Sequence, residues 1–546
     1  MPLASSTKTP QVSASIIFGG SGASPSSAPK RVLIIGSMIA SAITATMNTA
    51  VDATSDVVTA AGTATLDRAV QCTSPDNAAA LTGQGSELHR GAIAAYAQDR
   101  LANVTLAPVT YGTDPVRATA TITPTVGTLA SGTLRVIVCG RAVEVTVSSS
   151  DTVSTIGLKI AQAINAQRDW PVTAVNTWAT GAVAVSAKCA GPRGNAISLR
   201  CQLVSTTQTL DVATGTGVTL FGLTITLSSG AVDGGTYRLQ AGAVDDNLTA
   251  LLATLSGQKF DRIVFAGYRV GGTVSANLAR LCDAVDTQSE AAQMFDQQVV
   301  LGSLETLGNT VTLAQALNRA RSQWAWSYGA DDLPIEIAAV TAVARLAGDS
   351  AVGGGLVGEA SDPAANLNGM ELAALRTPRD PADLADPVEV ETALNAGISP
   401  LLASPTRTGR MMLAASITGR SLNGTTPDYS VYKTKDVTVP DWVRAEIVAD
   451  LRRTYRGYRI VADPADGLPP RQPRTTTPKS VKERVFGLLK RFEQRGILTE
   501  VDARRAEITV GINADNPRRV DFSFPCVPTQ DFDIADGTLH QLQPTS

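Results

Sequence analysis

The chain alternates between short apolar runs and amphipathic segments, a pattern that predicts α/β structure. Arg31–Gly36 is an apolar run ending in glycine and is predicted to be a buried strand. The segment Gly83–Glu87 precedes a predicted helix that ends near Ala97, and Val104–Val109 is the next predicted strand. The alternation resumes after Tyr237, with helices expected at Asp246–Leu255, Ala276–Ser289, Leu313–Arg321, Asp332–Ala347 and Val388–Asn395, and strands at Arg262–Ala266, Gln298–Leu301 and Gln323–Tyr328. These elements predict a mostly parallel or mixed sheet covered by helices.

Residues 114–233 have the pattern of an all-β segment with one helix. Alternation from Thr133 to Val147 around the turn Cys139–Arg141 predicts a hairpin. Asp151 or Thr152 can cap the following helix. That helix places Ile156, Ile160, Ala163 and Ile164 on one face, and further strands are expected near Val172–Val175, Val183–Ala187, Ile197–Leu203 and Val218–Leu227. Because α/β sequence lies on both sides of this β-rich segment, we expect an inserted domain.

The C-terminal part of the chain predicts a further module. It contains a strand at Met411–Thr418, a helix at Pro440–Tyr455, and a hairpin formed by Glu507–Ile512 and Arg519–Phe524. The segment Ser480–Arg495 is an amphipathic helix, with Val481, Val485, Leu488, Leu489 and Phe492 on one face and Lys482, Arg484, Lys490, Arg491 and Arg495 elsewhere. These cations form either a solvated face or a surface that docks onto an acidic partner, since cations on one rigid helix steer association.

The first thirty residues are rich in Pro, Ser and Gly and contain one alternating stretch, Val12–Phe18. A lone strand has no partner within its own segment, and its backbone polar groups must be satisfied elsewhere. The stretch either frays or docks onto a neighbour's sheet.

Composition narrows the classes of function. The net charge of −3 argues against nucleic-acid binding, which relies on a basic surface. No run of 18 apolar residues occurs, so no membrane insertion is expected, and the N-terminal residues lack the regions of a signal peptide. Six scattered cysteines without paired spacing suggest buried, reduced thiols, and two histidines give little support for a zinc site.

Candidate catalytic residues are few. His89 lies on a predicted helix and His540 lies near the C-terminus, both far from any nucleophile motif, so neither is expected to be catalytic. The strand ending at Gly36 lacks the later glycines of a dinucleotide-binding loop, and Gly83–Gly85 and Gly191–Gly194 lack the Lys-Ser/Thr of a phosphate-binding loop. Turns are the expected role of these glycines. The pairs Asp245/Asp246 and Asp331/Asp332 precede predicted helices and are expected to cap them. We therefore expect no catalytic residue, no cofactor and no metal ligand.

Taken in order, several stretches resemble the contractile tail sheath family of bacteriophages, particularly that of Mu-like phages. No single stretch is diagnostic, and the resemblance lies in the ordered set, which spans most of the chain. The stretches are Lys30–Gly36, Gly83–Leu88, Ser131–Val138, Asp151–Thr152, Ala163–Ala166, Trp170–Ala174, Gly191–Ile197, Asp362–Asn368, Leu394–Ile398, Asp428–Ser430, Asp441–Tyr455, Arg495–Leu498 and Asn513–Asp521.

The resemblance implies a structural subunit and not an enzyme. Sheath subunits form hexameric rings stacked helically around a tail tube, with arms that add strands to neighbouring subunits. Contraction, triggered at the baseplate, drives the tube through the host envelope without ATP. By this analogy, strand donation is assigned to Val12, Ala14, Ile16, Phe18, Val520, Phe522 and Phe524, and tube contact to Lys482, Arg484, Lys490, Arg491 and Arg495.

The implied fold is a multidomain α/β (α+β) protein, whose mixed-sheet sheath core carries a β-rich inserted domain and extended N- and C-terminal arms. The expected divisions are an arm at 1–29, the core at 30–110 and 236–405, an inserted outer domain at 111–235, a C-terminal inner domain at 406–524 and a second arm at 525–546. The implied partners are the chain itself and the tube, baseplate and tail terminator proteins. The implied location is the tail sheath of the virion, after synthesis in the host cytoplasm.

Two alternatives remain. One is another structural component of a phage, a tailocin or a related contractile injection system. The other is an oligomeric α/β enzyme, which would have a concave pocket with converging polar groups and shifted pKa values.

Overall fold

The computed structural model describes residues 30–49, 53–212, 217–233, 236–270, 272–290, 293–348, 363–464 and 472–531. Contacts divide these residues into two compact units. The first contains the described residues up to 348 together with Leu367–Val437, and the second contains 363–366 and the described residues from Thr438 onward. The predicted mixed α/β, multidomain fold is confirmed. Residues 1–29 and 532–546, which include most of the expected arms, lie outside the described residues.

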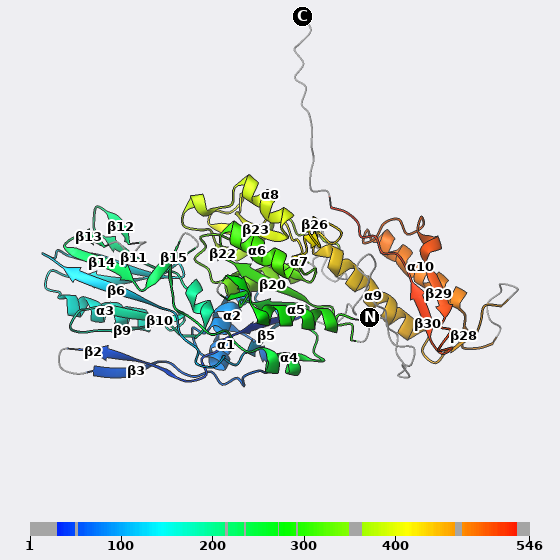
Figure 1. The fold of residues 1–546 in the computed structure, drawn as a ribbon, viewed down its shortest axis with the longest axis horizontal. Coiled ribbons are helices and arrows are strands. Elements are labelled where there is room, and N and C mark those ends of the chain that lie inside the picture. The colour runs from blue at the N-terminus through cyan, green and yellow to red at the C-terminus, as the bar shows by residue number, and fades with distance from the viewer. Residues whose placement is uncertain are drawn as a thin grey trace, which may run out of the picture. The chain divides into compact units, whose positions relative to one another are not determined.

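A nine-stranded mixed sheet forms the centre of the first unit, in the order β22-β24-β23-β21-β20-β17-β1-β5-β4 (Figure 1). The strands from β23 to β5 run parallel, while β4 and β24 pair antiparallel with their neighbours. In chain order the strands are β1 (Val32–Gly36), β4 (Val70–Cys72), β5 (Val104–Pro108), β17 (Arg262–Phe265), β20 (Gln298–Ser303), β21 (Ser322–Trp326), β22 (Met370–Arg376), β23 (Ile398–Ala403) and β24 (Arg410–Leu413).

Helices cover both faces of this sheet, because parallel strands buried on both sides need two apolar layers. Along β1, Val32 and Ile34 belong to the core cluster that includes α2 and α7, while Leu33 and Ile35 belong to the cluster that includes α4, α5 and α6. The helices are α1 (Pro75–Thr82), α2 (Glu87–Gln98), α4 (Thr249–Leu255), α5 (Ala276–Gln288), α6 (Leu307–Leu317), α7 (Pro334–Gly348) and α8 (Pro387–Asn395).

The β-rich segment is inserted between β5 and α4. Its entry and exit run antiparallel side by side, with bridges such as Val116 to Ala243 and Thr119 to Gln240. A five-stranded and a four-stranded sheet follow, with helix α3 (Val153–Ala166). Their strands are β6 (Thr119–Val126), β7 (Gly132–Val138), β8 (Arg141–Val147), β9 (Val172–Asn176), β10 (Val183–Ala187), β11 (Leu199–Val204), β12 (Thr209–Val212), β13 (Val218–Leu220) and β14 (Leu223–Ser228).

Two local predictions in this segment are confirmed, and one is wrong. The β7–β8 hairpin turns at Cys139 and Gly140, whose φ angles of 47° and 66° are those of a two-residue hairpin turn. Thr152 caps α3 in a capping box. The predicted single strand Val218–Leu227 is wrong, because Gly222 takes a φ of 79° and the chain turns back as the β13–β14 pair.

Other elements differ from their predictions. The hairpin of β2 (Ile43–Asn48) and β3 (Ala53–Thr59) was not predicted, although buried Ile43, Ala45 and Met47 alternate along β2. Helix α6 was placed too late, since Thr306 caps its start and Asn318, in the left-handed conformation, ends it. Asp245 and Asp246 do not cap α4, whose N-cap is Leu248. Asp245 instead accepts hydrogen bonds from Ser275 and Asn277.

The second unit contains α9 (Lys435–Thr454) from Thr438 onward, α10 (Pro478–Gln494) and a hairpin of β29 (Thr509–Ile512) and β30 (Val520–Ser523). Its core joins apolar side chains of α9 and α10, such as Val443 and Leu489. The C-terminal module was expected to begin at 406, whereas β24 belongs to the large sheet of the first unit. Shorter strand pairs are β15 (Gly230–Asp233) with β16 (Thr236–Leu239), β18 (Arg269–Val270) with β19 (Thr273–Val274), β25 (Leu422–Asn423) with β26 (Thr426–Pro427), and β27 (Arg459–Ile460) with β28 (Thr475–Thr476).

A buried ion pair joins α2 to α7. The Arg90 guanidinium, fully buried on α2, bonds to the Glu336 carboxylate on α7. Glu336 also accepts a hydrogen bond from the backbone N–H of Leu333 at 2.8 Å. Within the described part of the chain, Nε and Nη1 of Arg90 have no hydrogen-bond partner. Each charge of this pair therefore depends on the other, because burial of a lone charge is costly.

Replacing one member of this pair should be worse than replacing both. Glu336→Gln leaves the Arg90 charge uncompensated and should lower the free energy of unfolding by about 3 kcal/mol. The double variant Arg90→Met/Glu336→Leu removes both charges and should recover more than half of that loss. Urea unfolding of the three proteins measures the differences. A double variant no more stable than Glu336→Gln would contradict this account.

Candidate functional site

Helix α10 carries the five cations for which tube contact was predicted. Thr477 caps the helix by accepting a hydrogen bond from the N–H of Ser480, and Pro478 occupies the first turn, where its missing N–H costs nothing. The predicted apolar face is confirmed, because Val481, Val485, Leu488, Leu489 and Phe492 are all buried. This face fixes which side of the helix is turned away from the core of the second unit.

Three of the five cations are already engaged inside the second unit. Both Nε and Nη2 of Arg484 donate to the Asp450 carboxylate at 2.7 Å, and hydrogen bonds from Arg484 hold the pKa of Asp450 below its usual value. Lys490 forms ion pairs with Glu493 and, at 2.6 Å, with Asp502. The guanidinium of Arg495 lies 5.3 Å from the centre of the Trp442 ring.

Lys482 and Arg491 differ from these three. Neither side chain forms a hydrogen bond or ion pair with any of the residues that the structure describes, and Arg491 is exposed. The structure thus separates the predicted set into cations that stabilise the second unit and cations that are available to a partner. Which of the five contact a tube stays a prediction.

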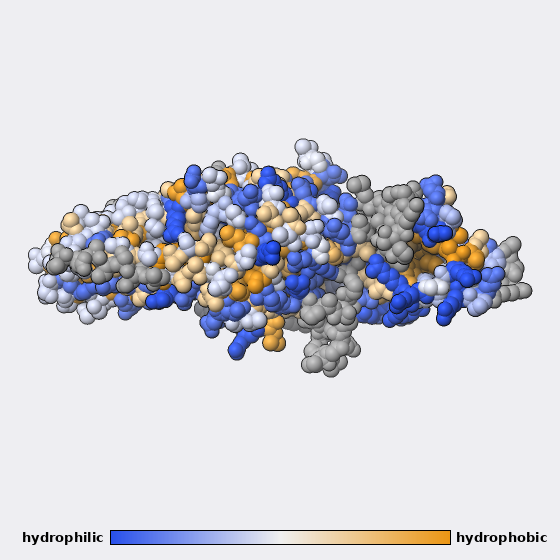
Figure 2. All heavy atoms as spheres, turned by 90° about the horizontal axis from the view of Figure 1, so that it is seen from below, coloured by the Kyte–Doolittle hydropathy of each residue, from blue (hydrophilic) through white to orange (hydrophobic). Residues whose placement is uncertain are grey.

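The C-terminal hairpin brings together the other predicted assembly residues. Val520 and Phe522 lie on β30, which pairs antiparallel with β29. Phe522 and Phe524 stack with ring centres 6.2 Å apart and contact the core of the unit while staying half-exposed. Among the described residues no third strand joins this sheet, so within that part of the chain neither of its outer edges is paired with a strand. Hydrophobic residues flanked by hydrophilic ones are visible on the surface of the second unit, at the right of Figure 2.

The predicted N-terminal strand cannot be located in the same way. Val12, Ala14, Ile16 and Phe18 lie outside the described residues. Strand donation by these residues, and by Val520, Phe522 and Phe524, stays a prediction.

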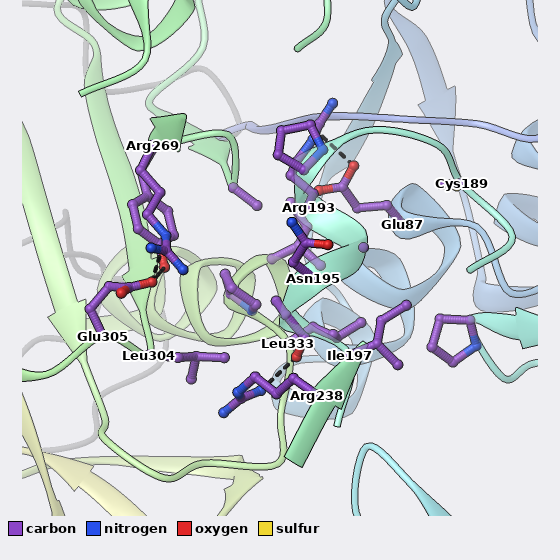
Figure 3. A pocket seen from close by; sticks show the side chains of 18 of the residues that line it. Glu87, Cys189, Arg193, Asn195, Ile197, Arg238, Arg269, Leu304, Glu305 and Leu333 are labelled. Atoms are coloured by element: carbon purple, nitrogen blue, oxygen red, sulfur yellow. Dashed lines mark hydrogen bonds and ion pairs between the residues drawn. The ribbon is translucent and has the colours of Figure 1, made fainter. Parts of the chain in front are cut away.

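The first unit contains a pocket that sequence reasoning did not predict. The chain passes from β1 to β5 on one side of the sheet and later to β17 on the other, which creates a switch point between β1 and β17. Open α/β sheets bind ligands outside the carboxyl ends of their strands at such a point. A pocket lies there, lined by Glu87, Cys189, Arg193, Asn195, Tyr268 and Glu305 among others (Figure 3).

The charged groups of this pocket have partners within the first unit. Arg193 forms an ion pair with Glu87 at 2.9 Å, Arg269 forms an ion pair with Glu305 at 2.7 Å, and Arg238 donates to the carbonyl of Ala196 at 2.6 Å (Figure 3). The pocket lies between the inserted domain and the sheet, and apart from these charged groups its lining is mainly apolar.

Burial shifts the pKa values of two candidate catalytic groups near the pocket. Burial lowers the pKa of His89 to about 4, and its Nδ1 accepts a hydrogen bond from the N–H of Gly85 at 2.9 Å. Burial also raises the pKa of the Cys189 thiol, which opposes formation of a thiolate. All six cysteines are free. His540 lies outside the described residues.

Metal-ligand clusters and membrane-spanning helices are both absent from the described residues. No group of three or more His, Cys, Asp or Glu side chains there is placed to hold a metal ion. None of the helices in that part of the chain combines the length and apolar character needed to cross a membrane.

Comparisons with known proteins concern the fold. No protein-family model matches the sequence, and no curated protein matches it. Among solved structures, a sheath tail protein from Desulfitobacterium hafniense has a TM-score of 0.44 and 12% identity, over 96% of this chain and 97% of that chain. A sheath tail protein from Listeria innocua has a TM-score of 0.43 and 12% identity, over 93% of this chain and 94% of that chain.

The internal role of Arg484 can be tested through its partner. Asp450→Asn keeps the shape of the side chain but weakens the ion pair, so we expect a loss of about 1–2 kcal/mol in the free energy of unfolding at pH 7. Because the folded-state pKa of Asp450 is depressed, its stabilisation is present above the unfolded pKa of about 4 and is lost as pH falls through the folded value. Thermal unfolding of both proteins from pH 7 to pH 3 should show the difference shrink below pH 4. A difference as large at pH 3 as at pH 7 would exclude the ion pair as its source.

Proposed function

We propose that this chain is the structural subunit of a contractile tail sheath. The observation that carries the proposal is the ordered set of sequence stretches that resemble the sheath family. Two of these stretches take part in the junction of the first unit: Gly83–Leu88 leads into α2, and Gly191–Ile197 forms the loop of the inserted domain that meets it. An α/β unit with a β-rich insertion and a separate C-terminal unit is the organisation that the resemblance implies.

Assembly proceeds by exchange of strands between subunits. The β29–β30 sheet supports strand exchange. Among the described residues it has only two strands, and a two-stranded sheet is marginally stable by itself and is stabilised by a third strand. The alternating segment Val12–Phe18 has the pattern of such a strand. In this proposal the N-terminal arm of one subunit pairs with the sheet of another, and the C-terminal residues from Val520 onward extend the same network.

The subunits form hexameric rings that stack around a tail tube in the virion. Contraction releases free energy stored in the packing of the subunits and drives the tube through the host envelope without ATP. Arginines of the switch-point pocket are already paired with carboxylates, which supports the proposal that no nucleotide binds there. The partners in this proposal are the chain itself, the tube protein, and the baseplate and terminator proteins.

The tube is contacted by the outer face of α10. Lys482 and Arg491 support this assignment best, because they retain charge that no described side chain neutralises. The other three cations, Arg484, Lys490 and Arg495, are held by Asp450, Glu493, Asp502 and Trp442.

Electron microscopy of the purified protein tests polymerisation. We expect hollow, striated tubes that survive dilution. Ile16→Pro should abolish them, because proline removes a backbone donor from the proposed strand and disfavours central pairing. Ser24→Pro, in the same Pro/Ser-rich segment but outside the alternating stretch, is the matched control. Discrete oligomers from the parent chain, or tubes formed equally well by Ile16→Pro, would contradict the proposal.

A second experiment tests the tube contact. The variant Lys482→Glu/Arg491→Glu should lose assembly on tubes made of the tube protein, since both charges are reversed while the ion pairs of Arg484 and Lys490 stay intact. Arg100→Glu, an exposed arginine of the first unit, serves as the control. Co-sedimentation and microscopy at low and moderate salt provide the measurement. Undiminished assembly of the double variant would exclude α10 as the tube-binding surface.

A further inference from the structure

The carboxylate of Glu87 lies where a ligand's anion would be expected in a sheet of this topology. Glu87 is the first residue of α2, and its Oε2 accepts a hydrogen bond at 2.8 Å from the backbone N–H of Ser37, directly after β1. The N-terminus of a helix and the backbone N–H groups at a strand end favour negative charge. In dinucleotide-binding folds, pyrophosphate occupies this position at the end of the first strand.

Gly36 makes room for that carboxylate. A Cβ atom at Gly36 would lie 3.0 Å from Oε2 and 3.2 Å from Cδ of Glu87. The absence of a side chain at the strand end therefore lets the carboxylate approach the backbone. Glycines in dinucleotide-binding loops allow phosphate to approach in the same physical way.

Arg193, from the inserted domain, covers the carboxylate from the other side. Its Nη1 lies 2.9 Å from Oε2 of Glu87, and its Nη2 donates to Oγ of Ser37 at 2.9 Å. The same guanidinium forms an ion pair with Asp246 and lies 5.7 Å from the centre of the Phe265 ring. Figure 3 shows Glu87 and Arg193 directed toward one another.

This cluster contains two acidic side chains for one arginine. The side chains of Glu87 and Arg193 are each 10% exposed, and that of Asp246 is 2% exposed. The surplus negative charge is compensated by the Ser37 N–H and the N-terminus of α2. The groups around Glu87 are thus placed to bind an anion, and the anion that they bind is the carboxylate of Glu87 itself.

We propose that the switch-point crevice is a small-oxyanion site occupied by the chain's own Glu87 carboxylate, with Arg193 of the inserted domain closing it. A free carboxylate ion takes the place of the side chain when Glu87 is truncated. The Glu87 carboxylate contacts both Arg193 of the inserted domain and the backbone at the end of β1, and so links the two sides of the crevice as a bound ligand would. This inference concerns the first unit alone and does not depend on polymerisation.

Chemical rescue tests the proposal. In the full chain, Glu87→Ala should lower Tm by roughly 5–15 °C, because Arg193 loses a buried partner. Sodium formate should then raise the Tm of the variant by about 3 °C over sodium chloride of equal strength, at a concentration about ten times its Kd. The parent protein should show no such difference between formate and chloride.

Two variants provide the controls. Glu87→Ala/Arg193→Ala retains the space but loses the guanidinium, so formate should act on it no more than chloride does. Glu87→Gln fills the space and should also be insensitive to formate. Equal formate effects in Glu87→Ala and the double variant, or no effect in Glu87→Ala, would overturn the proposal. If Glu87→Ala is recovered unfolded, the folded yield after refolding with formate or chloride is measured instead, and equal yields would overturn it.

Discussion

Strand β1 must be buried on both faces of a parallel sheet, and the rest of the first unit depends on that constraint. Its backbone pairs with β5 on one side and β17 on the other, so neither edge is open. Its side chains alternate between two helical layers, with Ile34 in one core and Leu33 in the other. Parallel neighbours need crossover connections: one leads from β1 to β5, and a later one leads from β5 back to β17 on the other side of β1. The crevice at the carboxyl end of β1 is the geometric result.

The inserted domain closes this crevice because of where the chain leaves the sheet. It departs after β5, at the same carboxyl edge where β1 ends. Polar contacts join it to the rest of the first unit: the Arg376 guanidinium donates to the carbonyl of Cys139 at 2.7 Å, and Ser198 donates to Asp331 at 2.8 Å. Buried polar groups need matched partners, so an interface of this kind favours one orientation over others.

The sequence predicted elements whose signals are local and missed relationships between distant segments. The burial of β1, the capping of α3 by Thr152 and the apolar face of α10 follow from periodicity and short-range chemistry. Helix α6 was misplaced because Asn318, which ends it in the left-handed conformation, was not used as a stop signal. The pairing of Glu87 with Arg193 was beyond sequence reasoning, since a glycine-flanked arginine indicates a turn but not its distant partner.

The five cations of α10 show the same limit of sequence-based prediction at a candidate site. Its own sequence gives five cations on one helix, but Asp450 lies on α9 and Asp502 lies in a loop, so their neutralising effect appears only in the folded unit. Docking of α10 onto a partner then depends on Lys482 and Arg491, the cations with neither an ion pair nor an aromatic ring contact among the described residues. The nearby β29–β30 hairpin has no third strand among the described residues. The two kinds of contact respond differently to salt, because ionic strength screens exposed charges but hardly affects main-chain pairing and apolar packing. Salt should therefore weaken attachment through α10 at concentrations that leave strand-paired contacts between subunits intact.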